Sequence, residues 1–422
     1  MPSAFTETFA SFRHRNYRLF FLGQTISLIG SWMQVVAQGW LVLTLTNSAF
    51  LLGLAGALHT LPMLLFSFWG GVIADHADKR RMVMLTNAAG LLLALILGLL
   101  VAFDLVAIWQ IMILVFGVGT AMAFDIPGRQ AFIIDLVGKS DLPNAIALNS
   151  SLFNGTRALG PAFAGLLIAS VGIANCFFLN ALSFLAPLIC LSLLRLHYQS
   201  TLRARPRTLA GLQELLTFIR HQRPELGWMM TIMACNSIFA FSFTVLLPMI
   251  ARDVLGTGPE GYGFLMAASG LGAFFGALTL ATFIRRHSPV YFFWGGAFLM
   301  FLALLFFSCT ENYKLALVCL FIAGFGLTVN ISTSNSLFQL NVPDELRGRI
   351  MSLFSFTFIG FTPIGNFFYG TLGQYFGPCF TVRLGASLAI ILSLSFLLAH
   401  PKLRRLHFNT EMDTIRVFGE RK

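Results

Sequence analysis

Charged residues are scarce in this chain: 11% of its 422 residues are Asp, Glu, Lys or Arg, against about 25% in ordinary soluble domains. Hydrophobic residues make up 57%, and they stand in long continuous runs without the alternation of barrel strands. A bilayer core requires roughly 20 apolar residues for each helical span, and backbone groups in lipid must be paired within helices or closed barrels. The composition therefore predicts an all-α integral membrane protein.

Cysteine pairs and catalytic motifs are also missing. The six cysteines form no CxxC pair, so neither a disulfide framework nor a zinc site is expected. Gly138-Lys139-Ser140 is similar to the end of a phosphate-binding loop, but Ile133 stands where that motif requires its first glycine. No HExxH or GxSxG sequence occurs. We expect no cofactor, no bound metal and no enzymatic activity, and an ion gradient as the energy source in place of ATP.

The apolar runs predict twelve transmembrane helices. We place them at 18–45, 49–74, 82–103, 105–127, 142–170, 172–194, 225–250, 261–284, 290–309, 315–338, 349–376 and 378–399.

The Lys and Arg residues are distributed unevenly between the two predicted sides of the membrane. With the N-terminus inside, Arg252, Lys314 and Arg383 fall near the outer side and Arg157 falls within a span, while the rest of the 28 Lys and Arg lie on inner segments. Cytoplasmic loops carry such an excess of Lys and Arg. The net charge of +11 thus predicts topology rather than nucleic-acid binding. We expect a multi-pass protein of the bacterial inner membrane with both termini in the cytoplasm.

Glycines recur at a constant offset in the two parts of the chain. Gly160, Gly165 and Gly172 are followed 205 positions later by Gly365, Gly370 and Gly377. We expect two six-helix bundles related by a pseudo-twofold axis, as in transporters that hold substrate near the bilayer midplane between parallel halves. The expected units are 1–194, a basic linker at 195–224, 225–399, and a cytoplasmic tail at 400–422.

The linker carries apolar residues at helical spacing. Leu209, Leu212, Leu216 and Ile219 recur beside charged positions, a pattern that fits a helix lying on the inner membrane surface. A plain solvated linker remains the alternative.

The segment 71–81 has five formal charges between two long apolar runs. It resembles the loop signature of the major facilitator superfamily, with His76 in place of the usual Arg. The matching residues are Gly71, Asp75, Asp78, Lys79 and Arg80. The segments 12–18, 127–165 and 342–352 resemble the efflux branch of that superfamily which includes the enterobactin exporter and macrolide efflux proteins. The resemblance covers nearly the whole chain and implies the major facilitator fold.

In that superfamily the signature belongs to a charge cluster that latches the two halves when the site faces outward. The resemblance implies that Gly71, Asp75, Lys79 and Arg80 form this latch, with Asp125 at the end of the fourth span as the third charged member. Retention of the loop on the inner side is a competing explanation for the basic residues.

Arg157 is a cation placed deep inside a predicted span. Such a charge costs roughly 2.5–3.5 kcal/mol at the bilayer centre unless it is paired or hydrated. Ser150, Asn154 and Arg157 share a helical face that is expected to border the central cavity. Arg157 would bind an anionic or catechol-like group or act on a nearby carboxylate; an Arg held by helix-terminal carbonyls is the alternative.

The first span has a polar stripe. Its members are Gln24, Ser27, Ser31, Gln34 and Gln38. A counterpart in the tenth span includes Ser332 and Asn335. We expect Gln34, Gln38, Ser332 and Asn335 to line the substrate cavity together with Asn154 and Arg157, although such residues also join neighbouring spans by hydrogen bonds.

Proton coupling requires a titratable group that the cavity can reach, and Asp125 and His59 are the candidates. His59 could equally be a packed donor within its helix.

The resulting hypothesis is a monomeric secondary transporter that uses the proton gradient to export a small amphipathic organic molecule, such as a siderophore or drug, by alternating access. A lysophospholipid or lipid flippase of the same fold and a non-transporting membrane sensor are the alternatives.

Overall fold

The protein is helical throughout the part that the computed structural model describes, namely residues 9–195, 215, 217–284 and 288–400. The side chains of Phe68, Asp75, His76, Asp344 and Glu345 lie outside this description. The N-terminal half comprises η1 (Ala10–Arg13), α2 (Arg15–Thr46), α3 (Ala49–His76), α4 (Lys79–Ala102), α5 (Ile108–Val171), α6 (Ile173–Ser183) and α7 (Leu185–Ser192). The C-terminal half comprises α9 (Pro224–Asn236), η2 (Ser237–Phe241), η3 (Ser242–Leu246), α10 (Leu247–Met249), η4 (Ile250–Val254), α11 (Pro259–Phe283), α12 (Pro289–Phe307), α13 (Tyr313–Leu340), α14 (Asp344–Gly360), α15 (Thr362–Phe376) and α16 (Pro378–Ala399).

The predicted twelve spans are present. In the described residues 11 helical segments are long and apolar enough to cross a membrane. One of them, α5, has 64 residues, about 96 Å of helix, and a hydrocarbon core is only about 30 Å thick. Gly138 interrupts it with φ 73°, a left-handed conformation that favours glycine. α5 is therefore the fourth and fifth spans joined at Gly138, and the loop expected between residues 127 and 142 is helical on both sides of that glycine.

Three spans are less regular than the sequence predicted. The sixth is divided at Phe184 into α6 and α7, and the eleventh at Phe361 into α14 and α15. The seventh passes through π and 3-10 turns between α9 and Val254. In each case a proline, Pro187, Pro363 or Pro248, follows shortly after the break. Proline removes a backbone donor and clashes with the preceding turn, so these breaks have a local cause.

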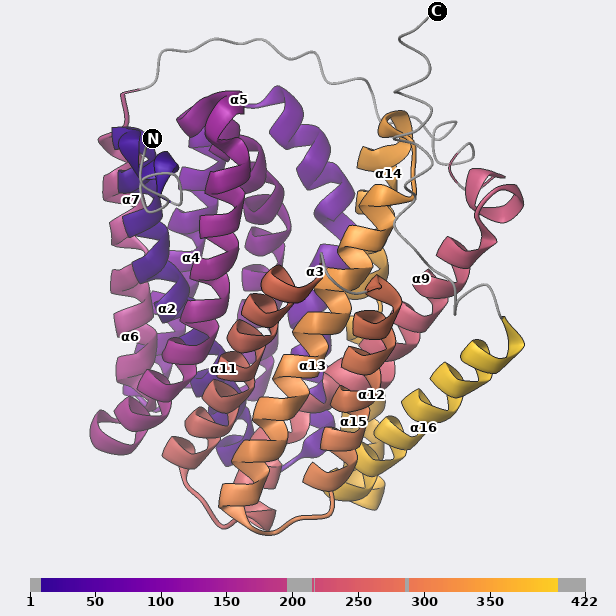
Figure 1. Cartoon of the computed structure of the whole chain (residues 1–422). Helices are drawn as coiled ribbons and strands as arrows, with labels where there is room; N and C mark the ends of the chain where they lie inside the picture. Colours follow the sequence, from indigo (N-terminus) through magenta and orange to yellow (C-terminus); the bar gives the residue numbers. More distant parts are fainter. Residues whose placement is uncertain (1–8, 196–214, 216, 285–287, 401–422) are drawn as a thin grey trace, which may run out of the picture.

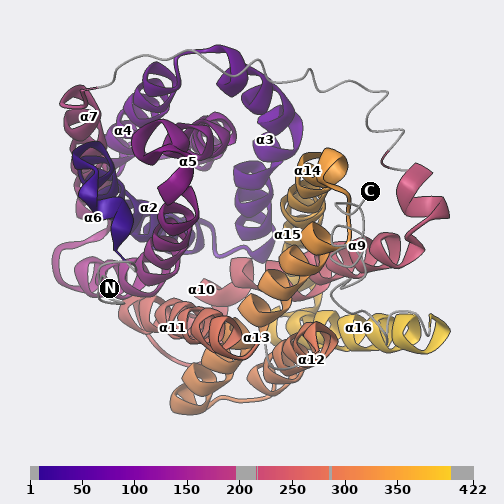
Figure 2. The ribbon, with the colours of Figure 1, turned by 45° about the horizontal axis from the view of Figure 1, so that its top comes forward.

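The two halves form separate bundles that lie side by side, with the N-terminal helices on one side and the C-terminal helices on the other (Figures 1 and 2). The duplication predicted from glycine spacing is visible in the backbone. Gly172 joins α5 to α6 with φ 88°, and Gly377 joins α15 to α16 with φ 83°. The fold is the major facilitator fold, with two six-helix bundles.

The halves meet closely at two glycine crossings. A Cβ on Gly53 of α3 would lie 2.4 Å from the Cα of Gly370 in α15, and one on Gly263 of α11 would lie 2.9 Å from the Cα of Gly165 in α5. A hydrogen bond also joins the two halves at the same end of the molecule, where Ser48 Oγ donates to Gln374 Oε1 at 2.8 Å. This end lies at the C-terminal end of α2, opposite the end at which α2 begins (Figure 1).

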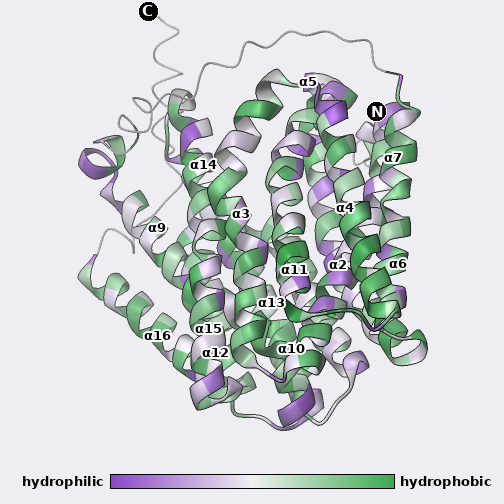
Figure 3. Ribbon diagram, turned by 180° about the vertical axis from the view of Figure 1, so that it is seen from behind, coloured by the Kyte–Doolittle hydropathy of each residue, from purple (hydrophilic) through white to green (hydrophobic). Residues whose placement is uncertain are grey.

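The helices consist largely of apolar residues (Figure 3), and many of these residues are exposed. Large apolar side chains such as Leu85, Leu92 and Ile391 are more than half exposed. Such a surface is stable in lipid and unfavourable in water, in agreement with a membrane location.

In the linker, the predicted positions Leu209, Leu212 and Leu216 lie outside the described residues. Residues 217–221 are helical, and Ile219 is buried in an apolar cluster with Leu226 and Met230 of α9. This part of the linker therefore packs on the protein.

Candidate functional site

A cavity of about 200 Å³ lies within the N-terminal half, lined by side chains from α2, α3, α4, α5 and α6. The whole polar stripe of the first span reaches it: Gln24, Ser27, Ser31, Gln34 and Gln38 line the wall on α2. Trp32, Phe153 and Phe184 supply aromatic walls. The cavity thus offers both amide hydrogen-bonding groups and apolar surface, a combination typical of sites for small organic molecules.

Asp125 and Arg129 form an ion pair in this cavity. Arg129 Nε lies 2.6 Å from Asp125 Oδ2, one helical turn away, and both side chains are mostly buried. Thr86 Oγ1 donates to Asp125 Oδ1 at 2.9 Å, and Arg129 Nη1 donates to Gln24 Oε1 at 2.6 Å. Asn87 Nδ2 is 3.4 Å from the same carboxylate oxygen. Side chains of α4 and α5 therefore hold the Asp125 carboxylate in place.

A second polar contact closes the cavity between α2 and α6. Asn180 Nδ2 donates to Gln34 Oε1, and Ser183 Oγ donates to Asn180 Oδ1 at 3.1 Å. Gln34 and Asn180 are 6% and 1% exposed. Buried amides need partners because an unmatched polar group costs about 1–3 kcal/mol, so this contact orients the Gln34 side chain.

His59 of α3 also lines the cavity. The backbone at His59 packs against Gly119 of α5, where an added Cβ would lie 2.1 Å from the His59 carbonyl oxygen. The structure therefore brings both predicted titratable residues, Asp125 and His59, to one cavity.

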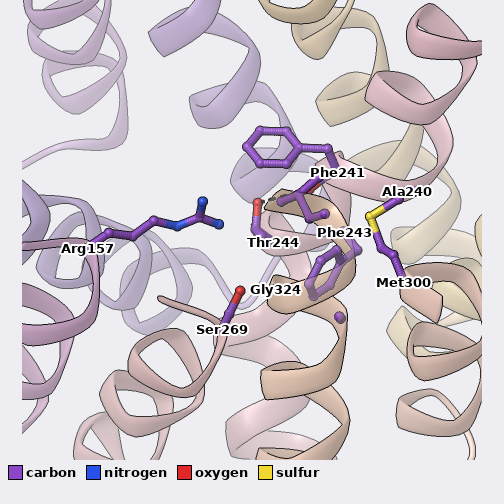
Figure 4. A pocket seen from close by; sticks show the side chains of 10 residues that line it. Arg157, Ala240, Phe241, Phe243, Thr244, Ser269, Met300 and Gly324 are labelled. Carbon is purple, nitrogen blue, oxygen red and sulfur yellow. Dashed lines mark hydrogen bonds between the residues drawn. The ribbon is translucent and has the colours of Figure 1, made fainter. Parts of the chain in front are cut away.

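Arg157 lies between the two halves. Its guanidinium carbon is 5.9 Å from the centre of the Trp32 ring, and the side chain extends toward Thr244 and Ser269 of the other half (Figure 4). A small cavity of about 10 Å³ is lined by Arg157, Thr244 and Ser269, and Trp32 does not reach it. Among the described residues Arg157 forms neither an ion pair nor a hydrogen bond.

Asn154 lies one turn before Arg157 and donates to Ser150 O at 2.9 Å. In α13 the Asn335 side-chain oxygen Oδ1 accepts from Gln339 Nε2 at 2.5 Å, and the backbone carbonyl of Ser332 accepts from Ser336 Oγ at 3.1 Å. Neither of the two cavities described above is lined by Asn154, Ser332 or Asn335.

The predicted latch residues have other partners in this conformation. Lys79 Nζ donates to Asp135 Oδ2 at 2.8 Å, while Asp125 pairs with Arg129. Arg80 Nη2 donates to Ser192 O at 3.0 Å. Gly71 is buried in α3 and Asp75 lies in the same helix, but the Asp75 side chain is outside the described residues.

Asp135 is thus an acidic partner of Lys79 in the segment 71–81, and the sequence did not predict it. It follows Asp125 by ten residues, about 15 Å along a helix, and the predicted end of the fourth span at residue 127 placed it in a loop. Arg129 was missed for the same reason, although its four-residue spacing from Asp125 was a usable signal. Asn87 and Asn180 stood alone in apolar runs and had no sequence partner.

No group of three or more His, Cys, Asp or Glu residues able to hold a metal ion occurs in the described part of the chain. The larger cavity is lined by amides, the Asp125–Arg129 ion pair and His59, and the smaller one by Arg157, which has no acidic partner in the described residues.

Fold and cavity together define a membrane transporter of the major facilitator class. The sequence profile of the family described as "Transmembrane secretion effector" matches residues 6–416, so the chain belongs to that family within the major facilitator superfamily.

Characterised relatives are similar over nearly their full length. The staphyloferrin A transporter of Staphylococcus aureus is 27% identical over 391 residues, covering 92% of this chain and 97% of the relative. The enterobactin exporter of Shigella boydii is 28% identical over 403 residues, 93% of each chain. The multidrug efflux pump Tap of Mycolicibacterium fortuitum is 26% identical over 389 residues, covering 89% and 93%. The relatives are transporters, in keeping with a non-enzymatic protein.

Solved structures agree on the fold. A bacterial homologue of the human lysosomal transporter Spinster, in an inward-facing conformation, superposes with a TM-score of 0.70 at 15% identity, covering 93% of this chain and 96% of the other. A bacterial homologue of the iron transporter ferroportin, in an inward-facing state, gives 0.64 at 16% identity, covering 90% and 98%.

Proposed function

We propose that this protein exports a small, amphipathic, anionic organic molecule of the siderophore kind by proton-coupled alternating access. The observation that carries the proposal is Arg157, a cation between the halves that has no acidic partner among the described residues. The relatives named as transporters of staphyloferrin A and enterobactin support the class of cargo.

Charge distinguishes this cargo from a cationic drug. In the larger cavity Arg129 is neutralised by Asp125, whereas Arg157 has a cation–π contact with Trp32 and no carboxylate partner among the described residues. An unpaired cation in the membrane interior costs roughly 2.5–3.5 kcal/mol, and an anionic ligand would recover part of this energy. A cationic ligand would add to it.

The ion pair supplies the coupling step. When Asp125 is ionised, it holds Arg129 at 2.6 Å. Protonation of Asp125 removes that attraction and leaves the Arg129 charge free to act on the cavity. Cargo at Arg157 and the proton at Asp125 would be linked through Trp32, which lines the cavity of Asp125 and lies 5.9 Å from the Arg157 guanidinium carbon. An exchanger requires such a link, because each ligand must change the affinity for the other.

The two halves, residues 1–194 and 225–399, would rock about this site, joined by the linker at 195–224, with 400–422 as a tail. We place both termini in the cytoplasm of a bacterium, on the basis of loop charge. The contacts between the halves at the opposite end, through Gly53–Gly370 and Ser48–Gln374, then close the outer side. A single chain contains the whole site, so we propose a monomer.

Inside-out membrane vesicles test the proposal. An imposed pH gradient is expected to drive uptake of apo-staphyloferrin A or enterobactin but not of ethidium, a lipophilic cation. Arg157→Gln should reduce siderophore uptake at least tenfold, and Asp125→Asn should remove the dependence on the gradient.

Arg81→Gln, at an exposed position that pairs with Asp78, is the control for loss of one positive charge. Uptake of ethidium in preference to both siderophores, or full gradient-driven uptake by Asp125→Asn at normal protein levels, would contradict the proposal.

A further inference from the structure

Arginines from two helices meet at the end of α7. Arg80 Nη2 at the start of α4 donates to Ser192 O at 3.0 Å, and Arg15 Nη1 at the start of α2 donates to Leu193 O at 3.4 Å. Asn16 fixes the next turn of chain, because its side chain donates to Arg195 O at 2.9 Å and accepts from Arg195 N at 3.3 Å. We call the cluster of Arg15, Arg80 and Arg195 the basic corner.

The charge of this corner is not compensated. Lys79 and Arg81, on either side of Arg80, are paired with Asp135 and Asp78. In the described residues no carboxylate pairs with Arg15, Arg80 or Arg195. Each guanidinium has five N–H donors, and those of Arg15 and Arg80 each make one hydrogen bond. Positive charge and free donors therefore remain.

Apolar side chains continue from the corner along the membrane-facing surface. On α2, Leu22 and Ile26 follow Arg18 at helical spacing and are 57% and 43% exposed. Leu185 and Ile189 on α7 and Leu193 just after its end repeat every four residues, and all three are exposed. α2 and α7 pack against each other, and α7 lies at the outer edge of the N-terminal bundle (Figure 2). The surface is charged at its end and apolar along its length.

We propose that the basic corner binds the phosphate of an anionic phospholipid, such as phosphatidylglycerol, with its acyl chains along the exposed faces of α2 and α7. Basic groups between membrane helices on the cytoplasmic side bind acidic headgroups in this manner. The apolar stripes select a lipid over a free phosphate, because only a lipid covers both parts of the surface. The site lies outside both cavities, so it is independent of the proposed cargo and coupling.

The first test uses the full chain purified in detergent with phosphatidylcholine. Adding phosphatidylglycerol is expected to raise the melting temperature, and glycerol phosphate is expected to have no effect. In Arg15→Gln/Arg80→Gln the rise in melting temperature should be less than half of that in the parent protein. Arg13→Gln/Arg81→Gln removes two charges from the same two segments and should retain the full rise.

An equal rise in both double variants would show a general charge effect and overturn the site. An equal rise with phosphatidylcholine would show that the apolar surface alone is responsible, and stabilisation by glycerol phosphate would identify a free phosphate as the ligand.

Native mass spectrometry of the unmodified protein provides a measurement that requires no variant. From an equimolar mixture, phosphatidylglycerol should be retained in preference to phosphatidylcholine at one lipid per chain. Equal retention would refute the proposal even if Arg15→Gln/Arg80→Gln fails to fold. Siderophore transport enters neither measurement, so failure here is distinguishable from failure of the proposed function.

Discussion

Asp125 and Arg129 lie one turn apart on α5, with 2.6 Å between the carboxylate and the guanidinium. The pair places a titratable acid in the cavity that the polar stripe of α2 also lines. Both charges are largely enclosed, so each depends on the other: removing one partner of a buried pair typically costs about 3–5 kcal/mol, while replacing both can be nearly neutral.

This dependence predicts that the effects of the two substitutions on thermal stability are not additive. Arg129→Gln leaves Asp125 without its cation, and Asp125→Asn leaves Arg129 without its anion. We expect each single variant to lower thermal stability more than the double variant does, with a coupling of about 0.5–3 kcal/mol. Melting curves of the four purified proteins measure it. Additive losses would show that the two charges act independently.

The glycine crossing between α5 and α11 predicts a selective effect of one methyl group. Gly165→Ala would place a Cβ 2.7 Å from Pro259 O and 2.9 Å from Glu260 Cα. Because these neighbours are backbone atoms, α5 and α11 must separate, at a cost of about 1–3 kcal/mol. A cysteine introduced at the buried Tyr262 should then react faster with a thiol reagent added in solution.

Gly155→Ala is the matched control. It lies in the same helix with no heavy atom within 4 Å of its added Cβ, and alanine is favoured over glycine in a helix by about 0.5–1 kcal/mol. Labelling should stay unchanged. Equal labelling of both variants would mean that the crossing does not hold the halves together.

The pair formed by Lys79 and Asp135 predicts rescue by charge exchange. Its side chains are 26% and 43% exposed, so Lys79→Ala should lower stability by no more than about 1 kcal/mol. Lys79→Asp should lower stability further, because it places a second carboxylate beside that of Asp135. Lys79→Asp/Asp135→Lys should restore both the melting temperature and transport, and failure to restore either would show that the pair has no role in this conformation.

The amide contact inside the cavity predicts a second rescue. Asn180→Leu removes the donor to Gln34 Oε1 and leaves a buried oxygen unpaired, at about 1–3 kcal/mol. Gln34→Leu/Asn180→Leu removes both polar groups and should melt closer to the parent protein. A double variant less stable than either single variant would indicate that other groups hold Gln34.

The polar stripe of α2 shows what residue spacing predicts well. Positions 24, 27, 31, 34 and 38 share a face in any regular helix, and all of them line the cavity. The spans followed in the same way from the length of the apolar runs, and the glycine repeat indicated the two halves before Gly172 and Gly377 showed matching backbone angles.

The partner of Lys79 is a contact that residue spacing failed to predict. The resemblance implied Asp125 as the acidic partner of the segment 71–81, because the fourth span was expected to end at residue 127. Helix α5 instead continues to Gly138, so Asp135 reaches this segment and Asp125 lies deeper, beside Arg129. Hydropathy indicates where a segment leaves the lipid, but it does not show whether the helix continues beyond that point.

The sequence by itself determined the helical membrane class, the number of spans and the repeated halves, because each follows from local hydrophobicity and from spacing along one chain. Tertiary structure alone decided which charges meet: Asp125 with Arg129, Lys79 with Asp135, and Arg157 with no acidic partner in the described residues. Contacts between helices depend on how far each helix runs and how it rotates against its neighbours. Packing over the whole bundle sets both of these quantities, and no single segment encodes them.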